Sequence, residues 1–134
     1  MMLLLLIPAA LAGDLVLAVT GEAAPAERVR CRAYAQAAAE RFPGGDTPHQ
    51  AQATLADGVA VVRFTGLPAG RYAVACLLDE DDDLALDTNL LGIPVEPWGV
   101  SGGARPAMRA PRFDEAAVVV PDAGAYTGGV ALAR

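Results

Sequence analysis

The sequence predicts an all-β fold, a single-domain, seven-strand antiparallel β-sandwich with a short helical insertion and one long irregular loop. Three observations support this prediction. The 134 residues leave room for one domain and one hydrophobic core. Alanine and valine make up much of the apolar fraction, while aromatic residues reach only 5%. Fourteen glycines and ten prolines separate short alternating segments, a pattern typical of many short strands.

Seven segments have the composition and the alternation expected of strands. The clearest alternation covers residues 28–34, where Arg28, Arg30 and Arg32 are expected to face solvent and the residues between them a core. Turn residues bound each segment at a spacing typical of a sandwich. The predicted strands are residues 14–20, 28–34, 50–56, 58–65, 71–78, 115–120 and 126–133.

Two of the connections have their own sequence signals. Residues 35–41 are rich in alanine and predict one or two helical turns, which end at the Pro43-Gly44-Gly45 stretch. The dipeptide Asp57-Gly58 is typical of a tight two-residue turn. It therefore predicts a hairpin between segments 50–56 and 58–65.

The two cysteines are predicted to form a disulfide. The alternation turns Cys31 toward the core, and it places Cys76 on one face with Tyr72, Val74 and Leu78. Closing a loop of about 45 residues would stabilise the fold by about 4 kcal/mol in the chain-entropy model. The alternative is two buried free thiols.

The first twelve residues, MMLLLLIPAALA, are predicted to be a signal peptide that is cleaved after Ala12. An apolar run of this length is too short to span a bilayer, which requires about 20 residues. Residues 13–134 would then form the single domain, in the periplasm or secreted, with no membrane insertion after signal removal. The alternative is a retained cytosolic chain.

The charge distribution narrows the classes of partner. The chain has a formal net charge of −6 and a pI near 4.6, and its ten basic residues are all arginines without a cluster. This composition argues against nucleic acid and against an anionic membrane surface as partners. Residues 79–87 hold six of the sixteen acidic residues, which accounts for the whole net charge.

The acidic run from Asp79 to Asp87 is the candidate metal site. Asp79, Asp81 and Asp83 occupy positions 1, 3 and 5 of an oxygen-ligand calcium loop, and Asp87 occupies position 9. Leucines stand at positions 6 and 12, where such loops usually have glycine and glutamate. The two readings are a Ca²⁺ site and a solvated acidic turn that keeps a sheet edge soluble.

Residues 88–111 are predicted to be a long irregular loop, because glycines and prolines interrupt any periodicity. Glu96, Trp98 and Ser101 are its candidate ligand-contact residues. Trp98 is either an exposed stacking residue or an anchor that packs the loop onto the sandwich. Ser101 lies in a G-x-S-x-G pattern, but neither a strand-to-helix turn nor a later histidine accompanies it, which argues against catalysis.

From Gly66 to Ala116 the chain resembles the exported bacterial proteins of domain-of-unknown-function family 2141. The matching residues are GLPAGRYAVACLLDEDDDLALDTNLLGIPVEPWGVS and, after a gap, APRFDEAA. The chain departs from the family pattern at Leu78, where a histidine is usual, and at Asp82 and Leu84, where glycines are usual. The Gly-Leu-Pro-Ala-Gly-Arg-Tyr lead-in also resembles Ig-like, transthyretin-like sandwich modules. This resemblance implies an architecture but no assigned activity.

Three functional hypotheses follow. The first is an exported binding or interaction module, not an enzyme, whose loop Asp79–Asp87 is ordered by Ca²⁺ and whose partner is a protein or an envelope or extracellular ligand. The second is a hydrolase that uses Asp79 or Asp87 as general base beside Glu96, in a cleft covered by residues 88–111. The third is a purely structural role for the acidic loop.

Overall fold

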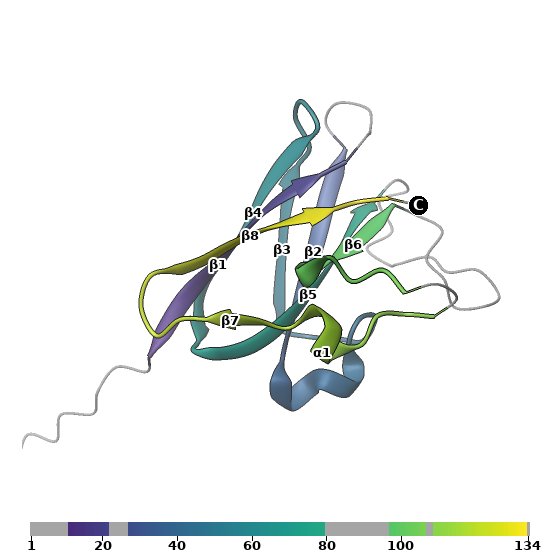
Figure 1. The fold of residues 1–134 in the computed structure, drawn as a ribbon. Helices are drawn as coiled ribbons and strands as arrows, with labels where there is room; N and C mark the ends of the chain where they lie inside the picture. The colour runs from purple at the N-terminus through teal and green to yellow at the C-terminus, as the bar shows by residue number, and fades with distance from the viewer. Residues whose placement is uncertain (1–10, 22–26, 80–96, 107–108, 134) are drawn as a thin grey trace, which may run out of the picture.

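The computed structural model describes residues 11–21, 27–79, 97–106 and 109–133. Within these ranges, eight strands form two sheets that pack against each other (Figure 1). The all-β sandwich predicted from the sequence is confirmed. It has eight strands rather than seven, because the stretch predicted to be irregular contains the short strand β6 (Trp98–Val100), which is followed by the 3₁₀ turn η2 (Ser101–Gly103).

The smaller sheet, here called the β1 sheet, has the order β4-β1-β8. Its strands are β1 (Ala12–Thr20), β4 (Val59–Pro68) and β8 (Ala125–Ala131). β1 pairs antiparallel with β4 but parallel with β8, so the expectation of a purely antiparallel sandwich is wrong at this pair. The first and last strands of the chain are therefore neighbours.

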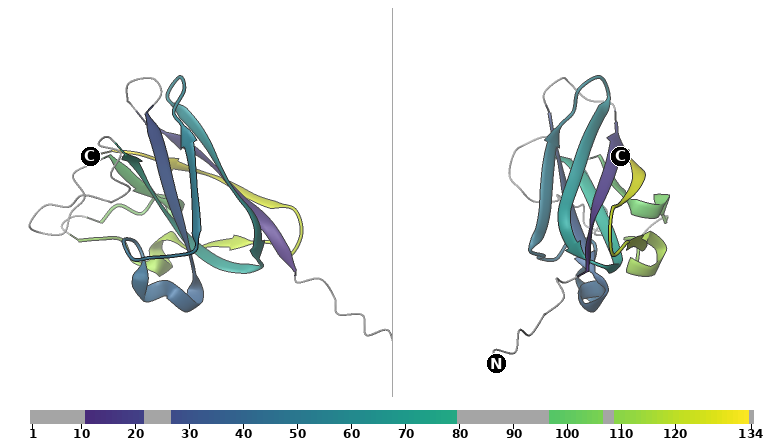
Figure 2. Two further views of the ribbon diagram at one scale, coloured as in Figure 1. Left: turned by 180° about the vertical axis from the view of Figure 1, so that it is seen from behind. Right: turned by 90° about the vertical axis from the view of Figure 1, so that its left-hand side faces the viewer.

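The larger sheet, here called the β2 sheet, has the order β3-β2-β5-β6. It contains β2 (Arg28–Ala35), β3 (His49–Thr54) and the central strand β5 (Gly70–Asp79), all paired antiparallel. A short strand, β7 (Val118–Val120), pairs with the beginning of β5, and β6 pairs with its later part. The ribbon from two further sides shows the two sheets as separate layers (Figure 2).

The predicted hairpin across Asp57-Gly58 is wrong, although the turn itself forms. Asp57 and Gly58 have φ values of 52° and 79°, as a tight two-residue turn requires, and a single bridge joins Ala56 to Val59. Beyond that bridge the strands diverge, since β3 pairs with β2 and β4 pairs with β1. The turn thus connects the two sheets and does not close a hairpin within one of them.

The predicted strand over residues 115–120 is half helical. Phe113–Ala116 form the single turn α1, and only Val118–Val120 extend as β7. The carboxylate of Glu115 accepts the backbone N–H of Arg112 at 2.8 Å, which caps this turn at its start. The helical insertion predicted after β2 is confirmed as the 3₁₀ segment η1 (Gln36–Arg41).

Two clusters of buried side chains hold the fold together. The larger cluster lies between the sheets and includes Leu15, Leu17, Val62 and Val74. The smaller cluster uses the opposite face of β5, where Ala73 and Ala75 alternate with the members of the first cluster. Its aromatic members are Tyr34, Phe42, Trp98 and Phe113. The structure shows no helix, among its described residues, that is long and apolar enough to cross a membrane.

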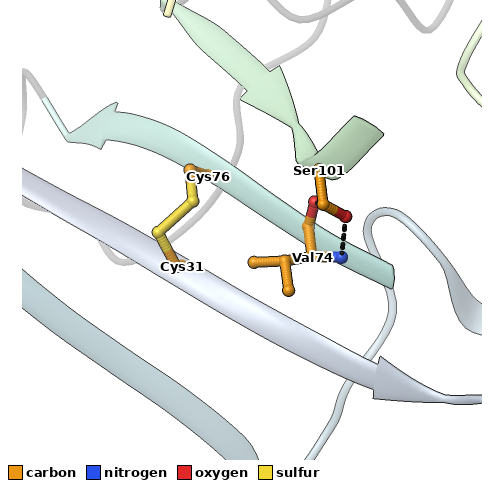
Figure 3. Close-up of a disulfide and its surroundings, with 4 residues drawn as sticks. All are labelled: Cys31, Val74, Cys76 and Ser101. Atoms are coloured by element: carbon orange, nitrogen blue, oxygen red, sulfur yellow. Dashed lines mark hydrogen bonds between the residues drawn. A yellow bond between two sulfur atoms is a disulfide. The ribbon is translucent and has the colours of Figure 1, made fainter. Parts of the chain in front are cut away.

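The predicted disulfide is present and joins Cys31 to Cys76 across neighbouring strands of the β2 sheet. Both residues are buried in the core between the sheets. Their Cα atoms lie 4.1 Å apart, and 45 residues separate them in sequence. The bridge therefore fixes the β2–β5 pair at the centre of the larger sheet (Figure 3).

Candidate functional site

The acidic run begins where β5 ends, at Asp79, and this residue is held firmly in place. Its side chain is fully buried, and its Oδ2 accepts the Nε–H of Arg30 at 2.5 Å. β5 lies between β2 and β6, so the backbone of Asp79 belongs to the most enclosed strand of the sheet. The first carboxylate of the predicted calcium loop is thus oriented by a cation from the neighbouring strand.

The ion pair engages one oxygen of the Asp79 carboxylate, since Oδ2 accepts the Nε–H of Arg30. A carboxylate has about four lone-pair sites, so this one bond does not by itself prevent Asp79 from acting as a metal ligand.

The other acidic candidates, Asp81, Asp83, Asp87 and Glu96, lie outside the described residues. The part of the chain that the structure describes contains no group of three or more His, Cys, Asp or Glu side chains close enough to hold a metal ion. Asp79 is accordingly the only predicted metal ligand whose surroundings the structure defines.

Trp98 anchors the start of β6. Its side chain is 7% exposed and packs into the smaller core cluster. The guanidinium of Arg105 lies over the indole, 4.2 Å from the ring centroid, and donates to the Trp98 carbonyl at 2.8 Å and to the Ala133 carbonyl. Of the two readings left open by the sequence, the structure places Trp98 as the anchor.

Ser101 is also a packing residue in this structure. Its side chain is buried, and its Oγ accepts the backbone N–H of Val74 at 2.9 Å (Figure 3). The same hydroxyl donates to the carbonyl of Ala116 at 2.6 Å. Ser101 thus links β5, η2 and the end of α1, and both hydrogen bonds hold its Oγ away from the surface.

A groove lies at the end of the sandwich where β1 and β8 end. Its volume is about 590 Å³, and uncharged residues line it. Two glycines, Gly21 and Gly58, form part of its wall. The remaining lining residues are Thr20, Pro97, Ala131, Leu132 and Ala133.

Sequence reasoning missed two arginines that organise this end of the molecule. Arg30 was expected to face solvent, yet its side chain is only 20% exposed and holds Asp79. Arg105 lies in a stretch without periodicity, so no pattern identified it as the residue that covers Trp98. Its place seven residues after the only tryptophan is the one signal available in the sequence.

Comparison with known proteins identifies a family. No curated protein and no solved structure matches the chain. Residues 18–127 match the family described as "Uncharacterized protein conserved in bacteria (DUF2141)", which covers most of the chain and all of the strands from β2 to β7. The chain therefore belongs to this bacterial family of uncharacterised proteins, domain-of-unknown-function family 2141.

Proposed function

We propose that this protein is an exported binding module whose acidic run, Asp79 to Asp87, takes up Ca²⁺ at the end of β5. The observation that carries the proposal is the buried Asp79–Arg30 pair, which fixes the first carboxylate of a run spaced for oxygen ligands. The Cys31–Cys76 disulfide supports export, because such bonds persist in oxidising compartments.

The partner contact in this proposal is made by the end of the sandwich and not by the buried residues Trp98 and Ser101. The two sheets position this end, and a groove lined by uncharged residues lies there. The groove includes Pro97, whose carbonyl accepts the N–H of Leu78, the residue before Asp79. Metal binding there would neutralise part of the charge of −6 that residues 79–87 carry.

Calcium titration by calorimetry, together with melting in calcium and in chelator, tests the proposal. We expect a dissociation constant of about 10⁻⁴ to 10⁻³ M, the range of extracellular calcium modules. Saturation at a hundredfold excess over that constant would stabilise the fold by about 2.7 kcal/mol.

The variant for this test replaces two predicted ligands other than Asp79, Asp81→Ala with Asp83→Ala. Its matched control is Asp114→Asn, which removes a carboxylate whose side chain is 83% exposed and which pairs with Arg71. We expect the double variant to lose calcium binding and the control to keep it. An unchanged melting curve in millimolar calcium would contradict the proposal.

A further inference from the structure

The strand β3 forms one edge of the β2 sheet. The order of this sheet ends at β3, which has no further strand partner among residues 11–21, 27–79, 97–106 and 109–133. None of its residues is fully buried, and every second one is exposed. In the view from behind, β2 and β3 are the nearest strands (Figure 2, left). The side of β3 that faces away from β2 can therefore accept a further strand.

The main chain of β3 directs alternate residues toward this edge. The Cα atoms of Cys31 and Cys76 lie 4.1 Å apart, the shorter spacing of a non-hydrogen-bonded pair, so the N–H and C=O of Cys31 point toward β3. The Leu55 N–H donates to the Glu27 carbonyl at 2.8 Å, which agrees with this phase. The residues of β3 between those bonded to β2 thus direct their N–H and C=O groups toward the edge. These outward-pointing residues are Gln50, Gln52 and Thr54.

The neighbouring edge of the β1 sheet, β4, is built differently. Its pairing with β1 has a register shift opposite Asp14, which marks a bulge, and it carries the charged residue Arg63. Bulges and charged side chains keep an edge strand from pairing with another chain. β3, in contrast, keeps a continuous register with β2 and contains no Asp, Glu, Lys or Arg. Of the two edges, β3 is therefore the one suited to strand pairing.

The outward-pointing groups of β3 are complementary to those of a second copy of the same strand. In an antiparallel pair with a two-fold axis at Gln52, this residue lies opposite its own copy, and Gln50 lies opposite Thr54 of the second copy. Residues opposite each other in this phase exchange two main-chain hydrogen bonds, so the three pairs make about six. Every outward-pointing residue of both copies then has a main-chain partner.

The side chains that this register brings together are small or uncharged. Ala51 faces Ala53 of the second copy on the side of the sheet that covers the core, so no bulky group separates the two strands. On the other side, Gln52 meets its own copy and Gln50 meets Thr54. No like charges lie directly opposite each other, an arrangement that would destabilise a strand pair.

The charged groups lie too far from the axis to oppose this pairing. The arginines of β2 already have partners within the chain, and three strand spacings, about 14 Å, separate them from their copies. Asp79, where the acidic run begins, lies on β5 at the level of Thr54. Its distance from its own copy is more than about 20 Å, well beyond the screening length of about 8 Å at physiological salt.

We propose that this protein forms a homodimer by antiparallel pairing of its β3 edges. The two β2 sheets then join into one continuous sheet, with the order β6-β5-β2-β3 in one copy and β3-β2-β5-β6 in the other. The two acidic ends of the dimer point in opposite directions, because the two copies of β5 run antiparallel. This inference goes beyond the proposed function and does not depend on calcium.

Cysteine cross-linking of the full chain tests the register. Gln52→Cys places a thiol opposite its own copy, at a Cα spacing of about 5.5 Å that a disulfide can bridge. Gln50→Cys is the matched control, because its copy lies about 14 Å away. The native cysteines are paired with each other and leave no competing thiol. We expect mild oxidation to give a covalent dimer with Gln52→Cys and at least about tenfold less of it with Gln50→Cys.

Non-reducing electrophoresis measures the two yields. Equal yields of covalent dimer from the two variants would overturn the proposal, because collisions or another interface would then explain the cross-link. The absence of a covalent dimer from both variants would overturn it as well.

Sedimentation equilibrium in the presence of chelator measures the association without a cross-link. We expect a dimer whose fraction rises with protein concentration. Gln52→Pro removes the N–H at the axis from both copies, so we expect at least about tenfold weaker association. Gln52→Ala keeps this N–H, and we expect less than about threefold weaker association.

Circular dichroism of both variants checks that the monomer is folded. A wild-type protein that stays monomeric up to millimolar concentration would overturn the proposal. Species that grow beyond the dimer would also overturn it, because they would indicate open-ended edge pairing and not a closed two-fold contact.

Discussion

The two edges of the β2 sheet differ in how they end. At the β6 edge, Trp98 and Ala133 exchange two main-chain hydrogen bonds of 3.0 Å, and Arg105 donates to both of their carbonyls. At the β3 edge, main-chain groups point outward beside a row of arginines and glutamines. One edge is thus closed by main-chain hydrogen bonds, whereas the other has no further strand beside it among the residues that the structure describes.

Removal of the disulfide should have the largest effect, because it joins the two strands that lie between these edges. For Cys31→Ala with Cys76→Ala we expect a loss of about 4 kcal/mol in the free energy of unfolding, from the restored entropy of a loop of 45 residues. Urea denaturation monitored by circular dichroism measures it. A loss below about 1 kcal/mol would mean that the sheet order is held by packing alone.

The sealed edge can be broken at Gly99. A Cβ added there would overlap the carbonyl oxygen of Ala131, so Gly99→Ala must separate β6 from β8. We expect a loss of about 3 kcal/mol. Gly44→Ala is the matched control, since its added Cβ would meet nothing within 4 Å. Equal melting temperatures of the two variants would contradict the close approach of these strands.

A pair of proline substitutions in β3 tests which of its N–H groups point toward β2 and which point toward the edge. Ala53→Pro removes an N–H that points to β2, and we expect it to cost about 2 kcal/mol. Thr54→Pro removes an N–H that points outward, and we expect it to cost less than about 1 kcal/mol. Chemical denaturation of both variants measures the difference. The reverse order would show that the phase assigned to the β3 edge is wrong.

The smallest expected effect concerns the helical turn α1, which contains Glu115. The guanidinium of Arg109 and the N–H of Arg112 lower the pKa of Glu115 from 4.5 to about 2. Because the folded pKa lies below the unfolded one, this contribution is present above pH 4.5 and is lost as the pH falls toward 2. The melting temperatures of the wild type and Glu115→Gln should therefore converge over that interval, and a constant difference would contradict it.

The sequence predicted the larger features of the fold because they rest on local periodicity. The alternation along Arg28–Tyr34 and along Tyr72–Leu78 predicted which side chains enter the core between the sheets, and with them the Cys31–Cys76 disulfide. The turn at Asp57-Gly58 was also correct as local geometry. Its strands separate because a two-residue turn determines only the first bridge, whereas the partner of β4 lies 39 to 56 residues earlier, in β1.

The candidate site was harder to predict because its described parts depend on contacts between distant residues. Arg30 meets Asp79 across 49 residues, and Ser101 meets Val74 across 27. No alternation signals β6, since three residues are too few to establish a period. The calcium ligands Asp81, Asp83 and Asp87 remain predictions from spacing.

The parallel pairing of β1 with β8 has a consequence for biosynthesis. The central strand β1 precedes the other described strands in sequence and its neighbour β8 follows them, so the β1 sheet is complete only after β8 has been synthesised. Contacts between sequence-distant strands also slow folding, because the loop between them must close before the contacts form.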